Sequence, residues 1–182
     1  MSIASGRAPV DAGAFRAALG HLAGGVAVVT VAGPAGPAGL TVTSLTAASL
    51  APPLLSFYVN HDSRSLPGLR TVDRFAVHLL DAGQHELAAL FARRGADRFA
   101  PPTRWRPGPD GVPLLADVPV WLLCDRREVI PVGDHFLVVG EVVGTEVRAG
   151  GEPLLHAHGQ FGRSVPLPSL PADLDFDGLA AW

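Results

Sequence analysis

The chain has 182 residues, of which 48% are hydrophobic and 17% are charged, and its formal net charge is −3. This length and hydrophobic content predict one domain with one well-buried core. All 14 basic residues are arginines and they are scattered, so the sequence lacks the basic patch of a nucleic-acid-binding protein. The absence of lysine excludes a Schiff-base mechanism and the usual covalent attachment of pyridoxal phosphate.

Cysteine usage and the apolar runs predict where the protein is found. Cys124 is the sole cysteine, which excludes an internal disulfide and a CxxC pair. The opening segment MSIASGRAPVDAG lacks the apolar core of a signal peptide. No run approaches the roughly 20 apolar residues that cross a bilayer. We therefore expect a cytoplasmic protein that contacts neither membrane nor nucleic acid.

The first third of the chain predicts a helix followed by a hairpin. Residues 1–12 are small, polar and unpatterned, and we expect a flexible lead-in. Asp11 is placed to cap a helix that carries an apolar stripe and ends at Gly24-Gly25. The β-branched run Val26 to Val31 predicts a buried strand, and the glycine-rich turn region 33–39 leads into the next strand.

The middle of the chain alternates short strands and short helices. Strands are predicted at Leu54 to Val59 and at Phe75 to Leu80, and Pro67 keeps any helix between them short. Asp81 should cap a second helix, Gln84 to Phe91. Residues 93–113 show no periodicity and predict a long loop, either a functional lid or a disordered segment.

The last third predicts long strands. Val118 to Val129 and Phe136 to Val147 are joined by IPVGDH, and Pro153 to Phe161 adds a short final strand. About six strands with hairpin connections and two or three peripheral helices favour a mainly β fold, a small antiparallel barrel. We expect this domain to span residues 13–163, with the tail 164–182 docked on the barrel or on a partner subunit.

The stretch from Gly39 to Ser65 carries the strongest functional pattern. Its hydroxyl groups are those of Thr41, Thr43, Ser44, Thr46 and Ser49. The run alone is also typical of an ordinary threonine-rich strand and turn. Its combination with Pro52-Pro53 and with Ser63-Arg64-Ser65, beside a predicted helix start, favours a ligand cradle that ends at an anion site.

Histidines and Arg98 supply the other candidates. Gly133-Asp134-His135 is either a simple turn with a solvated histidine or part of a site. His156 and His158 would share a strand face, but no third ligand accompanies them, so no metal is predicted. Arg98, in the long loop, either reaches a phosphate or is merely exposed. The remaining histidines are expected at the surface or as caps, and Cys124 is expected in the core; these histidines are His21, His61, His78 and His85.

Motifs for common nucleotide and hydrolase sites are absent from the sequence, namely GxGxxG after a strand, GxxxxGK[ST], GxSxG and HExxH. A nicotinamide nucleotide would therefore have to bind on a surface other than a Rossmann fold.

The run TVTSLTAASLAPPL, the later SRS and the still later VGDHFLVVGEV together resemble the flavin reductase family, which are FMN-binding split β-barrels. The segments FRAALGHLAGGVAVVT, DRFAVHLL, HELAALFA and GVPLLADVPVWLLCDRREV match the family in order and spacing, from about Phe15 to Phe161. The sequence departs from the family at Gly24-Gly25, where Thr-Gly is commoner, and at Leu45 and Ala47, within a commoner Ser-Phe-Thr-Ser-Val pattern.

The resemblance implies a homodimeric NAD(P)H-dependent flavin reductase that supplies reduced FMN or FAD to a partner monooxygenase. It implies that His135 positions the nicotinamide of NADH or NADPH. The alternatives are an oxidoreductase that retains its flavin and acts on a separate substrate, and a flavin-binding module without catalysis. The sequence leaves the choices of FMN or FAD, of NADH or NADPH, and of partner open. The expected flavin-site residues are Thr43, Ser44, Leu45, Thr46, Ala47, Ser49, Pro53, Ser63, Arg64, Ser65, Arg98, Asp134 and His135.

Overall fold

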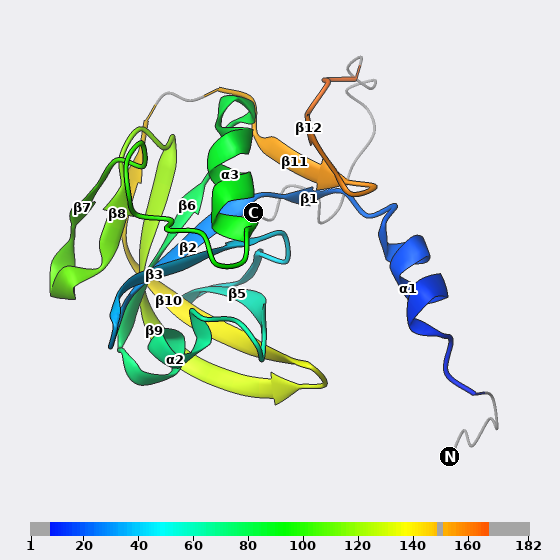
Figure 1. The fold of residues 1–182 in the computed structure, drawn as a ribbon, viewed down its shortest axis with the longest axis horizontal. Helices are drawn as coiled ribbons and strands as arrows, with labels where there is room; N and C mark the ends of the chain where they lie inside the picture. The colour runs from blue at the N-terminus through cyan, green and yellow to red at the C-terminus, as the bar shows by residue number, and fades with distance from the viewer. Residues whose placement is uncertain (1–7, 149–150, 168–182) are drawn as a thin grey trace.

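The structure is a computed structural model that describes residues 8–148 and 151–167 (Figure 1). Its helices are α1 (Ala12–Leu19), α2 (Leu66–Thr71), α3 (His85–Ala92) and the 3₁₀ turns η1 (Ala82–Gln84) and η2 (Pro109–Gly111). The first six strands are β1 (Gly24–Gly25), β2 (Ala27–Gly33), β3 (Gly36–Val42), β4 (Thr46–Leu50), β5 (Pro53–Asn60) and β6 (Arg74–Leu79). The others are β7 (Trp105–Pro107), β8 (Pro113–Leu115), β9 (Val120–Val132), β10 (His135–Val147), β11 (Leu154–Ala157) and β12 (Gln160–Arg163).

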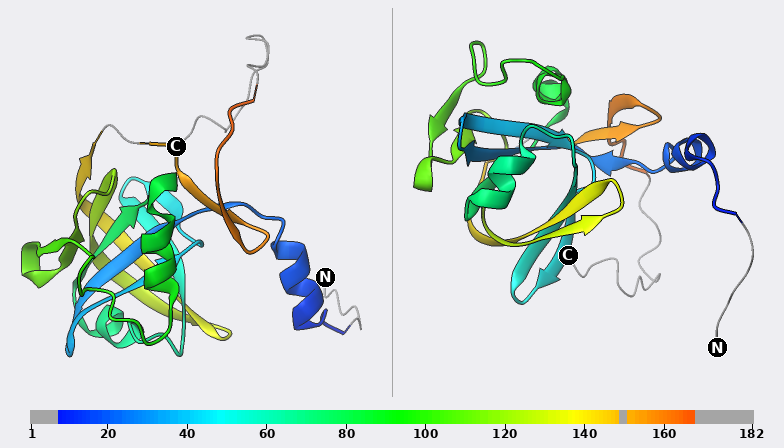
Figure 2. Two further views of the ribbon diagram at one scale, coloured as in Figure 1. Left: turned by 45° about the horizontal axis from the view of Figure 1, so that its top comes forward. Right: turned by 60° about the horizontal axis from the view of Figure 1, so that its bottom comes forward.

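A seven-stranded antiparallel sheet organises the molecule, with the strand order β3-β2-β6-β9-β10-β5-β4. β3 and β4 stand at opposite ends of this order, yet they follow each other in the chain. The four peptide steps from Val42 to Thr46 span at most about 15 Å. The sheet must therefore curl until its two ends approach each other, as the two views of Figure 2 show.

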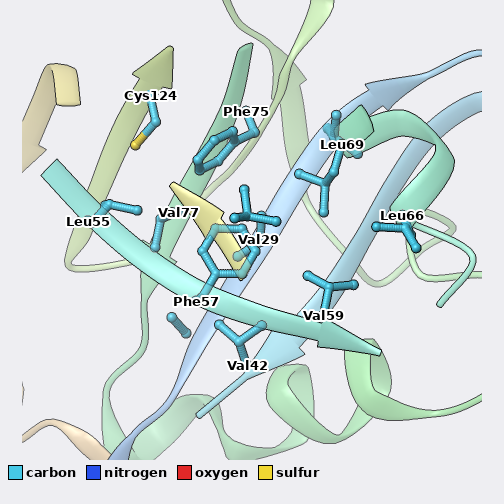
Figure 3. Packing of buried hydrophobic residues seen from close by; sticks show 13 residues of the cluster. Val29, Val42, Leu55, Phe57, Val59, Leu66, Leu69, Phe75, Val77 and Cys124 are labelled. Carbon is cyan, nitrogen blue, oxygen red and sulfur yellow. The ribbon is translucent and has the colours of Figure 1, made fainter. Parts of the chain in front are cut away.

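The interior of the curl holds the main core. Alternate residues of β5 point inward, and Leu55, Phe57 and Val59 are buried. The Phe57 ring meets Phe75 of β6 edge to face at 5.5 Å between ring centroids (Figure 3). Val42 of β3 belongs to the same cluster, so both ends of the sheet contribute to one core.

α3 covers the outer side of the sheet next to β3. Ala88 and Phe91 of this helix are buried, and Thr41 Oγ1 donates a hydrogen bond to the Ala88 carbonyl at 2.6 Å. A Cβ atom at Gly39 would lie 2.7 Å from the Phe91 ring, so only glycine allows this close approach. The segment after α3 is thereby held beside β3.

The mainly β class with peripheral helices is confirmed, but the strand count is higher than expected. Among the described residues there are twelve strands, and the single strand expected at 153–161 is the hairpin of β11 and β12. The expected loop 93–113 contains η2 and also β7, which pairs with β8. These strands are short, so local patterns carry little sign of them. Closure into a barrel stays a prediction.

Two expectations about where elements begin and end were wrong. The first helix ends at its C-cap Gly20, and Gly24-Gly25 is not its terminator but strand β1, paired with β11. The expected connection IPVGDH is largely strand, because β9 runs to Val132 and β10 begins at His135. Gly133, with φ of 59°, makes the tight turn between them.

His78, expected at the surface, is fully buried on β6. Its Nδ1 lies 3.1 Å from the Val28 carbonyl, and its Nε2 accepts a hydrogen bond from the Leu115 amide at 3.0 Å. Both ring nitrogens are therefore satisfied inside the protein, which permits burial. Cys124 is buried in the core, as predicted, and burial raises the pKa of its thiol to about 12.

α1 stands away from the sheet in both Figure 1 and Figure 2. Asp11 caps it as predicted, accepting hydrogen bonds from the amides of Gly13 and Ala14. None of its residues is buried. The domain bounds 1–12, 13–163 and 164–182 stay predictions, and most of the tail lies outside the described residues. Across 8–148 and 151–167, no helix has the length and apolar character to span a membrane.

Candidate functional site

An open cavity of about 580 Å³ lies on the outer surface of the curled sheet, where β3, β5 and the start of β10 meet the segment after α3. This volume is in the range of small-molecule sites. The residues that line it are Leu40, Thr41, Val42, Thr43, Ser44, Tyr58, Asn60, Asp62, Ser63, Arg64, Phe91, Ala92, Arg94, Gly95, Arg98 and His135.

The connection between β3 and β4 forms one wall of the cavity. Thr43 and Ser44 belong to this short connection, which crosses from one end of the strand order to the other. Ser44 Oγ accepts a hydrogen bond from the Tyr58 amide at 3.0 Å. This bond fixes the connection against β5, so that its backbone borders the cavity. β3 ends at Val42 and β4 begins at Thr46, so the hydroxyl-rich run consists of strand and turn, and the ligand cradle stays a prediction.

The outward face of β5 supplies the next side chains. Leu55, Phe57 and Val59 are buried, so the alternation of a strand places Tyr58 and Asn60 on the opposite face. The Tyr58 side chain is 43% exposed and lines the cavity. Asn60 is the β5 partner of His135 in the sheet. The strand pairing therefore brings His135 to the cavity from a position 75 residues further along the chain.

His135 is oriented by its neighbour Asp134. The His135 Nδ1 lies 2.6 Å from Asp134 Oδ1. This hydrogen bond to His135 is the main cause that lowers the pKa of Asp134. Because Nδ1 donates to the carboxylate, Nε2 is left for another partner. Half-exposed at the rim, His135 has access to a molecule that enters the cavity.

The turn after β5 places Ser63 and Arg64 at the cavity. Asn60 Oδ1 accepts a hydrogen bond from the Asp62 amide at 2.8 Å, and Ser63 Oγ accepts one from the Ser65 amide at 3.3 Å. These bonds fold residues 60–65 into a compact turn. Arg64 is exposed and lines the cavity, so its guanidinium is available to an anion. α2, which follows, has only six residues.

Arg98 is held at the cavity by backbone contacts. Its Nη1 donates to the Gly39 carbonyl at 2.7 Å and its Nη2 to the Arg93 carbonyl at 2.9 Å. Partial burial, together with the positive charge of Arg64, lowers the pKa of Arg98. Arg98 is therefore not the merely exposed loop arginine of the alternative expectation.

Six of the thirteen expected flavin-site residues line this one cavity: Thr43, Ser44, Ser63, Arg64, Arg98 and His135. Ser65 is fully buried, and its Oγ has no hydrogen-bond partner among the described residues. Its side chain is therefore not presented to a ligand at the cavity surface. Asp134 is exposed and touches the site through His135.

The other expected residues lie elsewhere on the surface. Leu45 and Thr46 line a second cavity of about 810 Å³, together with Thr43, Ser44 and parts of α1 and β11. Ala47 and Ser49 on β4 and Pro53 on β5 lie outside both cavities, at the edge of the sheet. The expected cradle is therefore divided between two surfaces.

Sequence reasoning missed Tyr58, Asn60, Asp62 and Arg94 as cavity residues. The alternation of β5 was a usable signal for Tyr58 and Asn60, because a strand with one buried face presents its other residues outward. Arg94 carried no such signal.

Histidines 156 and 158 do not share a strand face, because β11 ends at Ala157 and His158 lies in a turn with φ of 51°. Among the residues that the structure describes, no group of three or more histidine, cysteine, aspartate or glutamate side chains is arranged to hold a metal ion.

Comparison with known proteins identifies the family of the chain. The model of the flavin reductase like domain family matches residues 19–164, most of the chain. The chain belongs to this family. The family assignment and the enzyme class, an oxidoreductase, are thus confirmed.

Three relatives illustrate the family. The NADH:FMN oxidoreductase of Rhodococcus erythropolis is 39% identical over 162 residues, covering 87% of this chain and 84% of that protein. The reductase component of a 4-nitrophenol and 4-nitrocatechol monooxygenase of Rhodococcus opacus is 34% identical, covering 87% and 84%. The NADH:FAD oxidoreductase SgcE6 of Streptomyces globisporus, solved with NAD and FAD fragments, superposes with a TM-score of 0.79 at 35% identity, covering 86% and 94%.

Proposed function

We propose that this family member is an NAD(P)H-dependent flavin reductase, which transfers a hydride from C4 of the nicotinamide to N5 of FMN or FAD. The observation that carries the proposal is the single cavity shared by Thr43, Ser44, Ser63, Arg64 and His135. Relatives named as NADH:FMN and NADH:FAD oxidoreductases support the same reaction.

The residues of the cavity fit a flavin nucleotide. The flavin, when bound, accepts the hydride, so the protein needs no nucleophile of its own. The connection at Thr43 and Ser44 offers hydroxyl and backbone groups along the ring, and Ser63 with Arg64 would hold the phosphate. The exposed Tyr58 ring supplies apolar surface beside them. The contribution of the chain is binding and orientation.

His135 would position the hydride donor. Asp134 fixes the ring through Nδ1, so Nε2 can hydrogen bond the carboxamide of the nicotinamide. We infer a binding role for His135, not transfer of a proton. The choice between NADH and NADPH is not carried by this contact, since both share the same carboxamide.

The direct test is oxidation of NADH and of NADPH by the purified protein with FMN, FAD or riboflavin added in turn, and with no flavin as the control. We expect oxidation that saturates with added flavin. Tight flavin binding without any oxidation of either nucleotide would refute the reductase and favour a flavin-binding module. Oxidation that requires a further organic substrate would favour an enzyme that retains its flavin.

We further propose that the reduced flavin passes to a flavin-dependent monooxygenase. The relative named as a reductase component of such a system supports this proposal. A test is to supply the protein, NADH and FMN to an oxygenase component that lacks its own reductase. Hydroxylation that depends on this protein is expected, whereas a need for chemically reduced flavin in its presence would contradict the proposal.

A homodimer is the proposed assembly. Phe15, Leu19 and Leu22 in and after α1 are 54%, 52% and 72% exposed, and a second copy would cover them. Sedimentation equilibrium should give twice the chain mass of 18.9 kDa. The double substitution Phe15→Ser with Leu19→Ser should shift the mass toward the monomer, whereas a parent that sediments as a monomer would refute the dimer. We also propose a cytoplasmic location, in keeping with the lone, buried Cys124.

A further inference from the structure

Three arginines gather at the flavin cavity, namely Arg64, Arg94 and Arg98. Asp62 is the one carboxylate in its lining, and Asp62 Oδ1 lies 3.5 Å from Nδ1 of the His61 ring. Among the described residues, none of these three arginines forms an ion pair with a carboxylate. Six other arginines do so elsewhere on the molecule: Arg74, Arg104, Arg126, Arg127, Arg148 and Arg163.

Arg98 is the most constrained of the three. Its two terminal nitrogens are fixed on the carbonyls of Gly39 and Arg93. Its Nε is buried and has no hydrogen-bond partner among the described residues. A partly buried cation beside a second cation is unfavourable unless an anion lies near both. The arrangement thus retains positive charge that the protein's own carboxylates do not neutralise.

The three arginines come from two separate segments. Arg64 lies in the turn after β5, beside Ser63, whereas Arg94 and Arg98 follow α3, which packs on β3. One phosphate at Ser63 and Arg64 would satisfy the first segment alone. The positive charge on the second segment therefore exceeds what a flavin mononucleotide requires.

We propose that Arg94 and Arg98 form a second anion subsite, which binds the outer phosphate of a dinucleotide. This inference rests on the proposed function and names a substrate class for the same cavity. A pyrophosphate linked to adenosine is the shared chemistry of FAD and of NAD(P)H. If the dinucleotide is FAD, the two arginines select FAD over FMN. If it is NADH or NADPH, the two arginines recognise the hydride donor.

The test uses Arg94→Gln, because Arg94 is exposed and its substitution leaves the backbone contacts of Arg98 intact. Arg98→Gln is the second variant. The matched control is Arg93→Gln, since the Arg93 side chain is exposed and lies outside the cavity lining. Dissociation constants of riboflavin, FMN and FAD are measured by titration calorimetry, and Michaelis constants of NADH and NADPH are measured with riboflavin as acceptor.

We expect Arg94→Gln to weaken binding of one dinucleotide about tenfold, because a charge-assisted contact is lost. The dissociation constants of FMN and riboflavin should change less than about twofold. A selective rise in the FAD dissociation constant identifies the flavin dinucleotide. A selective rise in the Michaelis constants of NADH and NADPH identifies the hydride donor.

If Arg94→Gln raises the dissociation constants of FMN and FAD equally, the inference is overturned, because the arginine then binds the phosphate that both flavins share. No change in any constant, or the same change in Arg93→Gln, would also overturn it. If the parent protein binds FAD but oxidises neither NADH nor NADPH, the proposed reductase activity is refuted. The FAD dissociation constants of the parent and the variants then still test the anion subsite. A parent that binds no flavin would refute both.

Discussion

Asn60 of β5 and His135 of β10 are paired residues of neighbouring antiparallel strands, and both line the cavity of about 580 Å³ that we propose as the flavin site. The Asp134 carboxylate, 2.6 Å from the His135 ring, sets the ring's orientation from the turn next to this pair. The sheet itself thus fixes the histidine beside the cavity, because a strand register does not shift without moving every side chain of the strand to the other face.

Replacement of His135 by alanine should raise the Michaelis constant of NADH about tenfold, because one hydrogen bond to the nicotinamide is lost. The FMN dissociation constant should change less than about twofold. Steady-state kinetics and fluorescence titration measure the two effects. The matched control is His61→Ala, an exposed histidine of the neighbouring turn that lies outside the cavity lining. Unchanged kinetics in His135→Ala would remove this residue from the site.

Replacement of Arg64 by alanine should raise the dissociation constant of FMN about tenfold. The dissociation constant of riboflavin, which has no phosphate, should stay unchanged. Arg64 is exposed and makes no ion pair among the described residues, so the free energy of unfolding should stay within about 0.5 kcal/mol of the parent. Calorimetric titration with both ligands and urea unfolding provide the measurements. If the variant binds riboflavin and FMN more weakly by the same factor, Arg64 acts on the flavin ring or on the fold and not on the phosphate.

His78 should make the stability of the fold depend on pH. Burial lowers the pKa of His78 from 6.5 to about 4 in the folded protein, so the unfolded chain binds a proton more readily. The free energy of unfolding should therefore fall as the pH falls from about 6.5 toward 4, by up to about 3 kcal/mol. Protonation would place a hydrogen on Nε2, which now accepts from the Leu115 amide.

The control for this effect is His78→Gln, whose amide can donate and accept but does not titrate. Urea unfolding of parent and variant at pH 7.5, 6, 5 and 4.5 should show that the free energy of unfolding falls more steeply with falling pH in the parent than in the variant. Parallel curves for the two proteins would mean that other groups cause the dependence on pH.

Substitution of Gly39 by alanine should disturb both the fold and the cavity. The new methyl group would lie 2.7 Å from the Phe91 ring and 2.9 Å from the Val29 carbonyl. Such overpacking costs about 1–3 kcal/mol, and a shift of α3 would move Arg98, which donates to the Gly39 carbonyl. Urea unfolding and FMN titration should both report a loss. Gly162→Ala, where a Cβ meets no atom within 4 Å, is the matched control and should change neither.

The sequence by itself determined those features that depend on neighbours in the chain. The alternation of β5, the cap at Asp11, the tight turn at Gly133 and the order of the family segments were all readable from local pattern. Such patterns follow from backbone geometry and from which side chains can be buried, and both act over a few residues. The mainly β class followed from them, whereas the flavin reductase family rested on the resemblance of the chain's segments to that family.

The tertiary structure alone decided which residues share the cavity. The curl of the sheet brings the end of β3 near β5, and the packing of Phe91 against Gly39 places Arg94 and Arg98 beside them. Leu45 and Thr46 line the second cavity instead, and long-range contacts bury His78 and Ser65. These outcomes depend on how residues far apart in the chain fill one volume, and no local pattern encodes that packing.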